Sequence, residues 1–253
     1  MKHYHGTPIG GKRSAAEDFC ERRHLLIPWK RPEDLERAME YSRGFMVDNS
    51  AFSFWTSGEK PNWTEYVKWC RTFARHPRFD FALVPDAIDG SERDNDDLLR
   101  IWDRHGWHPV RIAGCPVWHL HESIDRLKKL CGGRWERVAI GSSGEWPNPG
   151  VGTWWDRMDE AFDAIVDEDG YPLAHMHGLR MLRSDIIQRY PFASCDSTNA
   201  VQNGARTAVQ IGTDSSWGQM TIARRIERTM SPSRWLPKSQ RQNDLFSLSG
   251  EFR

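Results

Sequence analysis

The residue that most suggests chemistry is Asp196. It ends a short apolar run that starts at Pro191, and small and hydroxyl residues follow it as far as the turn signal Asn203–Gly204. A carboxylate at the end of a buried strand is unfavourable unless it is paired or takes part in a reaction. Asp196 is therefore expected to be either the N-cap of the next helix or a catalytic group.

Other apolar runs also end in polar residues or glycine. Besides Asp196, the residues expected at strand ends are Asp48, Asp86, His119, His121, Gly141, His175 and His177. In a barrel of parallel strands, the carboxyl ends of the strands lie at one end and carry the chemistry. Three carboxylates and several histidines would then converge, which predicts an active site at that end.

The elements that position these residues follow a repeated plan, in which a short apolar run precedes a helical pattern. The eight runs are 2–9, 24–29, 44–52, 79–85, 110–120, 137–141, 172–177 and 191–204. Strands alternating with helices predict a parallel sheet with right-handed crossovers, and eight units predict an α/β fold of the (β/α)8 TIM-barrel type. An open doubly wound sheet is the alternative, but no Gly-x-Gly-x-x-Gly follows the first run.

Helix starts are marked by capping residues. Asn62 with Glu65 forms a plausible capping box, and Ser91 and Ser123 precede two further helical patterns. A helix over 31–43 and a short one over 184–190 are also expected.

Composition narrows the class of protein. The 253 residues carry 35 basic and 35 acidic side chains, so the net charge neither requires nor excludes a nucleic-acid partner. The five cysteines are scattered without a Cys-x-x-Cys, which favours reduced thiols in the cytoplasm. No signal peptide or membrane span is recognisable.

We expect residues 1–214 to form the barrel, and 215–253 a basic C-terminal helix and tail that packs on it or extends from it.

Five segments, in order from about Phe45 to Gly204, resemble the tRNA-guanine transglycosylase family. Segment 48–52, Asp-Asn-Ser-Ala-Phe, is similar to that family's Asp-Ser-Gly-Gly-Phe, and 84–86, Val-Pro-Asp, lies where the family has a base-recognising aspartate. Segment 139–145 is similar to the Gly-Gly segment that faces the base and ends in Gly-Glu. Segment 177–179 with 186–187 is similar to the turn and helix before the nucleophile strand, and 192–198 with 203–205 to the nucleophile segment itself.

Departures from the family pattern indicate a branch of it. The family's zinc site is absent, His119-Leu120-His121 replaces the usual Gln-Gly, and Asp196 follows the cysteine that the family's aspartate precedes. The short chain without a zinc appendage is more similar to the compact phage and bacterial relatives that insert 7-deazaguanine bases into DNA. This resemblance implies a cytoplasmic enzyme, in the host cytoplasm if it is encoded by a phage.

The resemblance also implies roles for individual residues. Asp196 would be the nucleophile, Asp48 the general acid and base, and Asp86 the acceptor for base N–H groups. The further substrate-binding residues expected are Ser50, Phe52, His119, His121, Gly141, Ser142, His177 and Gly178. No cofactor or metal is expected. The expected partners are a free 7-deazaguanine base and a polynucleotide, with DNA favoured over tRNA, and a homodimer is left open.

Two basic clusters could contact a polynucleotide. One consists of Lys12, Arg13, Arg22 and Arg23, and Arg224, Arg225 and Arg228 lie in the other. The alternative for the second cluster is an ordinary solvated helix.

Two other functions remain open from the sequence. The pairs His3-x-His5, His119-x-His121 and His175-x-His177 suit a metal-dependent hydrolase on the same barrel, because alternate residues of a strand share a face. A non-catalytic nucleic-acid-binding barrel is the third interpretation.

Overall fold

Nine parallel strands form one sheet in a computed structural model that describes residues 1–7, 13–106 and 111–236. Their order around the sheet is β5-β4-β3-β2-β1-β9-β8-β7-β6. The strands are β1 (Lys2–Gly6), β2 (His24–Pro28), β3 (Gly44–Asp48), β4 (Phe79–Leu83), β5 (Gly114–Cys115), β6 (Val117–His119), β7 (Arg137–Gly141), β8 (His175–Gly178) and β9 (Ser194–Ser197).

The sheet closes on itself through the segment that contains β5 and β6. Only Pro116 separates these two short strands; β5 pairs with β4, whereas β6 pairs with β7. The carbonyl of Pro116 also accepts a hydrogen bond of 2.8 Å from the backbone N–H of Ala139. Counted as one interrupted strand, this segment completes the parallel barrel of the TIM type that the sequence predicts, and that prediction is confirmed.

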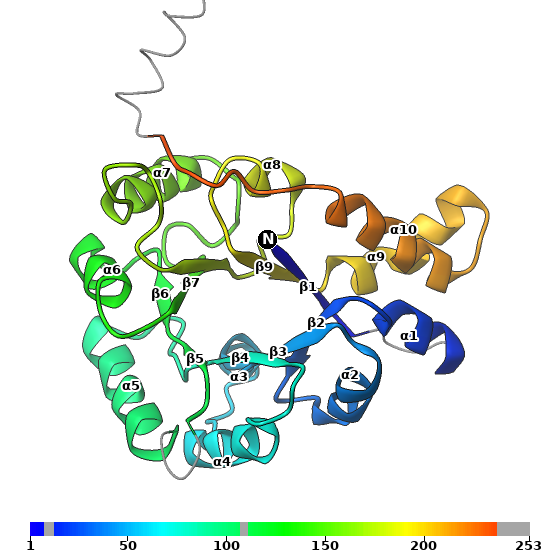
Figure 1. The fold of residues 1–253 in the computed structure, drawn as a ribbon, viewed down its shortest axis with the longest axis horizontal. Helices are drawn as coiled ribbons and strands as arrows, with labels where there is room; N and C mark the ends of the chain where they lie inside the picture. The colour runs from blue at the N-terminus through cyan, green and yellow to red at the C-terminus, as the bar shows by residue number, and fades with distance from the viewer. Residues whose placement is uncertain (8–12, 107–110, 237–253) are drawn as a thin grey trace, which may run out of the picture.

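Most of the helices surround the ring of strands, whereas the short helix α3 lies over one end of it (Figure 1). The helices are α1 (Arg13–Cys20), α2 (Leu35–Tyr41), α3 (Ala51–Ser57), α4 (Trp63–Phe73), α5 (Glu92–Gly106), α6 (Ile124–Cys131), α7 (Trp154–Ala164), α8 (Ser184–Ile187), α9 (Asn199–Ile211) and α10 (Ser215–Glu227). All three expected caps are present: the Asn62 side chain accepts from the backbone N–H of Glu65, that of Ser91 from Asp94, and that of Ser123 from Arg126.

Two predictions about the elements are wrong. The turn signal Asn203–Gly204 lies inside α9, where Gly204 allows a close approach to Gln219 of α10. The third run was expected to continue as a strand to Phe52, but β3 ends at Asp48 and α3 begins at Ala51. The chain turns at Ser50, whose φ of 61° lies in the left-handed region. The apolar residues after this turn therefore belong to a short helix over the end of the barrel, where Phe52 lines a cavity.

Strand residues divide between two cores because successive side chains point to opposite faces. Tyr4, Met46, Phe81 and Val117 fill the barrel interior. Their neighbours on the strands pack outward against the helices, as Leu25, Ile27, Phe45 and Val47 do. All five cysteines are buried and unpaired.

Asp80 occupies the amino-terminal end of the barrel interior. It forms an ion pair with Lys2 and accepts a hydrogen bond of 2.7 Å from the Tyr4 hydroxyl. Burial alone would raise the pKa of Asp80, but hydrogen bonds from His24, Lys2 and Tyr4 outweigh it and lower the pKa to about 2. The chemistry of interest lies at the other end.

The C-terminal part of the described chain lies against the barrel. Helices α9 and α10 form a hairpin (Figure 1), and Ala223 and Ile226 of α10 belong to the cores between strands and helices. The chain then continues to Trp235, which packs against Tyr190 and Phe162 at ring-centroid distances of 5.2 and 5.7 Å. The rest of the expected tail, 237–253, lies outside the described residues. No helix in the described part is long and apolar enough to cross a membrane.

This packing predicts that Trp235→Ala lowers the free energy of unfolding by about 3–5 kcal/mol, because it removes a large side chain that is 2 % exposed. Urea denaturation of the full chain measures the change. Trp217→Ala is the matched control, since Trp217 on α10 is 52 % exposed and its loss should change stability by about 0.5 kcal/mol or less. Equal effects of the two substitutions would contradict this packing.

Candidate active site

A small cavity of about 80 Å³ opens at the carboxyl ends of the strands. All three predicted carboxylates line it: Asp48 at the end of β3, Asp86 just after β4, and Asp196 in β9. The other lining residues are Asn49, Ala51, Phe52, Leu83, Ile88, His119, Gly141, Ser142, Leu179 and Arg180. The barrel thus brings together residues that are up to 148 positions apart in the sequence, from Asp48 to Asp196.

Asp48 is the carboxyl group whose environment most strongly favours protonation. Burial raises its pKa from 3.8 to about 7, and the nearby charges of Asp196 and Asp86 add to the rise. The backbone N–H of Ser50, 2.6 Å from Oδ1, and the positive charge of Arg180 oppose it. Asp48 can therefore exchange a proton near neutral pH, as a general acid or base must.

Asp86 is held by donors on both of its oxygens. The Asn49 side-chain amide donates to Oδ1 at 2.6 Å and also to the Val84 carbonyl at 2.8 Å. His119 Nε2 lies 2.9 Å from Oδ2. These contacts fix the Asp86 carboxyl group at the cavity wall, where its remaining lone pairs can accept hydrogen bonds from a ligand.

Asp196 is also held through both oxygens. His177 Nε2 lies 3.0 Å from Oδ2, and the backbone N–H of Arg180 donates to Oδ1 at 3.1 Å. Arg180 has a φ of 57°, which is uncommon for a residue with a side chain and is found mainly where the surroundings enforce it. The alternative that Asp196 caps the next helix is not realised, because no side-chain hydrogen bond caps α9 and Thr198 is the residue at its N-cap position.

The rim of the cavity carries exposed aromatic and basic groups. Phe52 is 45 % exposed and packs against Trp55, which is 50 % exposed, with ring centroids 5.7 Å apart. The Arg180 guanidinium lies 4.8 Å from the centre of the Phe52 ring. Such a surface can stack on a flat, electron-rich ligand.

Four of the residues expected to bind substrate do not line the cavity. Ser50 is buried and its hydroxyl accepts from the backbone N–H of Lys30, while His121 is exposed and bonds to Ser143 and Gly90. His177 is fully buried beneath Asp196, and Gly178 packs closely against Cys195 and Met181. Ser142 does line the cavity, and its hydroxyl accepts a hydrogen bond of 2.9 Å from Trp154.

Asn49 and Arg180 are site residues that sequence reasoning missed. The position of Asn49 next to Asp48 was a usable signal, since an amide beside a strand-end carboxylate can hold a second one. Arg180 follows Gly178 in the turn after β8, but nothing in the sequence indicates its left-handed backbone.

The basic residues expected to bind a polynucleotide do not line the cavity. Arg224, Arg225 and Arg228 are exposed at the C-terminal end of α10, and Arg224 lies over the ring of Trp217. Lys12 lies outside the described residues. Arg13 begins α1, and its side chain is not described.

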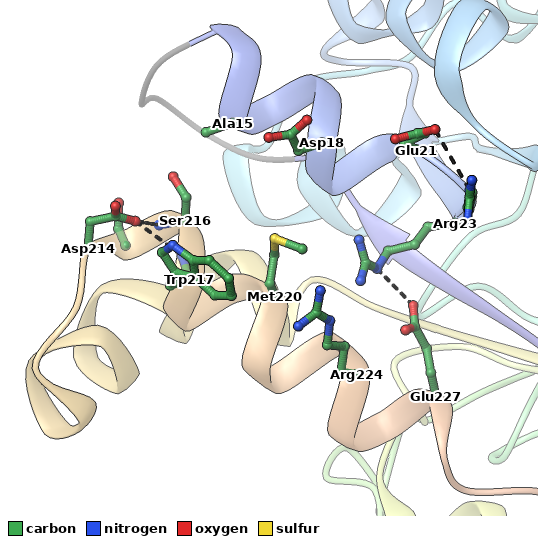
Figure 2. Close-up of a pocket in the computed structure, with 12 residues that line it drawn as sticks. Ala15, Asp18, Glu21, Arg23, Asp214, Ser216, Trp217, Met220, Arg224 and Glu227 are labelled. Atoms are coloured by element: carbon green, nitrogen blue, oxygen red, sulfur yellow. Dashed lines mark hydrogen bonds and ion pairs between the residues drawn. The ribbon is translucent and has the colours of Figure 1, made fainter.

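A larger groove of about 840 Å³ runs between α1 and α10 (Figure 2). Both acidic and basic side chains line it, and Arg23 and Glu227 form an ion pair across it at 2.9 Å. Because its charges have mixed sign and do not converge, we assign the chemistry to the smaller cavity.

The three His-x-His pairs do not converge. His3 and His5 point outward from β1, toward Thr229 and Glu227, because Tyr4 between them faces the interior. His175 is exposed at the start of β8, at the other end of the strand from the cavity. Within residues 1–7, 13–106 and 111–236, no group of three or more His, Cys, Asp or Glu side chains is arranged to hold a metal ion. The ligand set on which the hydrolase hypothesis depends is therefore not formed.

Comparisons with known proteins assign no family. No protein-family model and no curated protein matches the chain. Among solved structures, the chain is similar to two mutant tryptophan synthase alpha-subunits from the hyperthermophile Pyrococcus furiosus, each at 10 % identity over 89 % of this chain and 95 % of theirs, with TM-scores of 0.47 and 0.48. This distant likeness is one of fold and identifies no activity.

The raised pKa of Asp48 predicts a pH-dependent effect on stability. Because the folded state keeps the proton up to about pH 7 and the unfolded state loses it near 3.8, folding becomes less favourable as the pH rises through this window. Asp48→Asn, which cannot ionise, should equal wild type near pH 3.5 and exceed its unfolding free energy by roughly 4 kcal/mol at pH 8, since each pKa unit corresponds to about 1.4 kcal/mol. Denaturation at both pH values measures this; a difference that does not change with pH would contradict it.

Proposed function

We propose that this protein is a transglycosylase that exchanges guanine in a polynucleotide for a 7-deazaguanine base through a covalent Asp196-glycosyl intermediate. The observation that carries the proposal is the convergence of three carboxyl groups on one cavity, those of the buried Asp86 and Asp196 and of the half-buried Asp48, with the pKa of Asp48 raised to about 7. One group that exchanges a proton near neutral pH, beside a second with a fixed orientation, suits substitution at an anomeric carbon.

The proposed reaction has two similar halves. In the first, Asp196 attacks C1′ of the nucleoside, the bond from C1′ to guanine N9 breaks, and protonated Asp48 supplies the proton that the departing guanine needs. In the second, Asp48 takes a proton from the incoming 7-deazaguanine, whose nitrogen attacks C1′ and releases Asp196. The proton count balances, and neither half needs an oxidant, a reductant or a further cofactor.

Asp86 is proposed to recognise the base. A carboxylate only accepts hydrogen bonds, so it selects ligands that present N–H groups, as guanine and 7-deazaguanines do. Gly141 favours this arrangement, because a Cβ at that position would lie only 3.0 Å from Nδ1 of His119, which holds Asp86. A side chain there would displace His119 or occupy space proposed for the base.

A polynucleotide substrate is supported by the size of the cavity and the nature of its rim. A cavity of about 80 Å³ is far below the roughly 300–1,000 Å³ of sites that enclose whole ligands, so only part of a large substrate would enter it. A base would have to leave its stack to do so. The side chains at the rim, Phe52, Trp55 and Arg180, could stack on neighbouring bases that stay outside the cavity. DNA is favoured over tRNA through the resemblance to the compact relatives.

Substitution of the carboxylates tests the mechanism. Asp196→Asn should abolish exchange of labelled guanine into DNA, because the amide cannot attack C1′, whereas Asp48→Asn should reduce it by about 10²–10⁴-fold through loss of proton transfer. Asp125→Asn, at an exposed position on α6, is the control and should leave exchange unchanged. A covalent adduct formed by the Asp196→Asn protein would show that another carboxylate is the nucleophile. Binding of DNA by wild type without exchange would instead favour the non-catalytic barrel.

Neutralising the basic end of α10 tests the contribution of that helix to polymer binding. Replacing Arg224, Arg225 and Arg228 with Gln should weaken DNA binding and reduce its dependence on salt, because fewer counterions are released from the phosphates. The control replaces three exposed arginines elsewhere on the barrel, Arg100, Arg104 and Arg134. If both triple variants have the wild-type salt dependence, α10 is an ordinary solvated helix.

A further inference from the structure

His177 is a buried titratable residue that the proposed mechanism leaves unused. Its side chain is fully buried in the barrel interior, with Nε2 3.0 Å from Asp196 Oδ2 and Nδ1 2.8 Å from the Ser194 hydroxyl oxygen. Phe81 and Tyr4 contact the ring edge-on, at centroid distances of 5.2 and 6.0 Å. The ring is therefore confined by packing as well as by hydrogen bonds.

Ser194 determines which nitrogen of His177 carries the proton. The Arg137 guanidinium, which can only donate, lies 3.2 Å from the Ser194 oxygen and supplies that oxygen with one hydrogen bond. Ser194 is completely buried, and within the described residues its hydroxyl hydrogen has no acceptor other than His177 Nδ1. A hydroxyl hydrogen left unpaired there would be costly, so Nδ1 accepts and the proton of the neutral ring is on Nε2.

The chain of hydrogen bonds runs in one direction from Arg137 to Asp196. Arg137 donates to Ser194, Ser194 to His177, and His177 through Nε2–H to Oδ2 of Asp196. Burial lowers the pKa of His177, against the opposing effect of Asp196, which favours the neutral ring that this chain requires. The backbone N–H of Arg180 holds the other oxygen of Asp196.

We infer that His177, fixed as its Nε2–H tautomer by Ser194 and Arg137, is a positioning residue that orients the Asp196 carboxylate toward the cavity. His177 does not contact the substrate; it acts through Asp196. Two donors on two oxygens fix the plane of the carboxylate and leave its remaining lone pairs for the attack on C1′. That last step rests on the proposed function, whereas the tautomer and the contact with Asp196 do not.

Two amide substitutions separate this role from a general structural one. In His177→Gln the terminal amide can reach the position of Nε2 and still donate to Asp196, whereas in His177→Asn it reaches only the position of Nδ1, beside Ser194. The two variants are alike in polarity. We expect the His177→Gln protein to form the covalent adduct with a guanine-containing single-stranded DNA oligonucleotide within about tenfold of the wild-type rate. For His177→Asn we expect a loss of about 100-fold with KM little changed, since misplacing a reacting group by about 1 Å has an effect of that size.

Equal rates of adduct formation in the two variants, at equal thermal stability, would overturn the inference. A His177→Asn protein whose KM is raised while its rate of adduct formation is unchanged would also overturn the inference.

A spectroscopic measurement tests the inference without any reaction. In ¹⁵N-histidine-labelled full-length protein, the His177 ring, assigned by its absence from the His177→Gln spectrum, should show the neutral Nε2–H pattern. Ser194→Ala should shift it toward a mixture of tautomers. A neutral Nδ1–H ring or an imidazolium at pH 7 would overturn the inference, even for a protein that exchanges bases. The Nε2–H pattern in a protein without exchange would leave the contact with Asp196 supported and contradict only the proposed function.

Discussion

The site depends on electrostatic repulsion between three carboxyl groups that the barrel places around one small cavity. Burial disfavours the charge on Asp48, and the nearby charges of Asp196 and Asp86 disfavour it further. The three carboxyl groups have different numbers of hydrogen-bond donors. Asp86 is held by Asn49 and His119, and Asp196 by His177 and the backbone N–H of Arg180. Asp48, with one backbone donor, has its pKa raised to about 7. The unequal distribution of donors distinguishes Asp48, which can exchange a proton near neutral pH, from the two carboxyl groups that are held through both oxygens.

Side chains in the barrel interior, on the amino-terminal side of the cavity, also hold this arrangement in place. The interior is not uniformly apolar, because Arg137, Ser194 and His177 form a polar path from its amino-terminal half to Asp196. Rings such as Phe81 confine that path and keep water from competing for its hydrogen bonds. The Asp196 carboxylate is thus held by side chains packed in a layer beneath the cavity, whereas Phe52 at the rim is exposed.

Much of the fold could be predicted from the sequence, because a buried parallel strand is a short apolar run and a helix start has a recognisable cap. The convergence of Asp48, Asp86 and Asp196 followed from strand ends meeting at one end of a barrel. Which way a side chain faces could not be predicted in the same way. The outward direction of His3 and the inward direction of His177 depend on the register of each strand in the closed sheet, and the turn at Arg180 depends on a backbone conformation that only tertiary contacts enforce.

The central claim is that this site exchanges a base in a polynucleotide, and the chemical composition of nucleic acid tests it most directly. Total DNA and total RNA are isolated from cells that make 7-deazaguanine bases and express either the wild-type chain or its Asp196→Asn variant, and their nucleosides are measured by mass spectrometry. The account predicts a 7-deazaguanine deoxynucleoside in the DNA of cells with the wild-type chain and none with the variant. The absence of deazaguanine nucleosides from both DNA and RNA, with the wild-type chain folded and abundant, would contradict it.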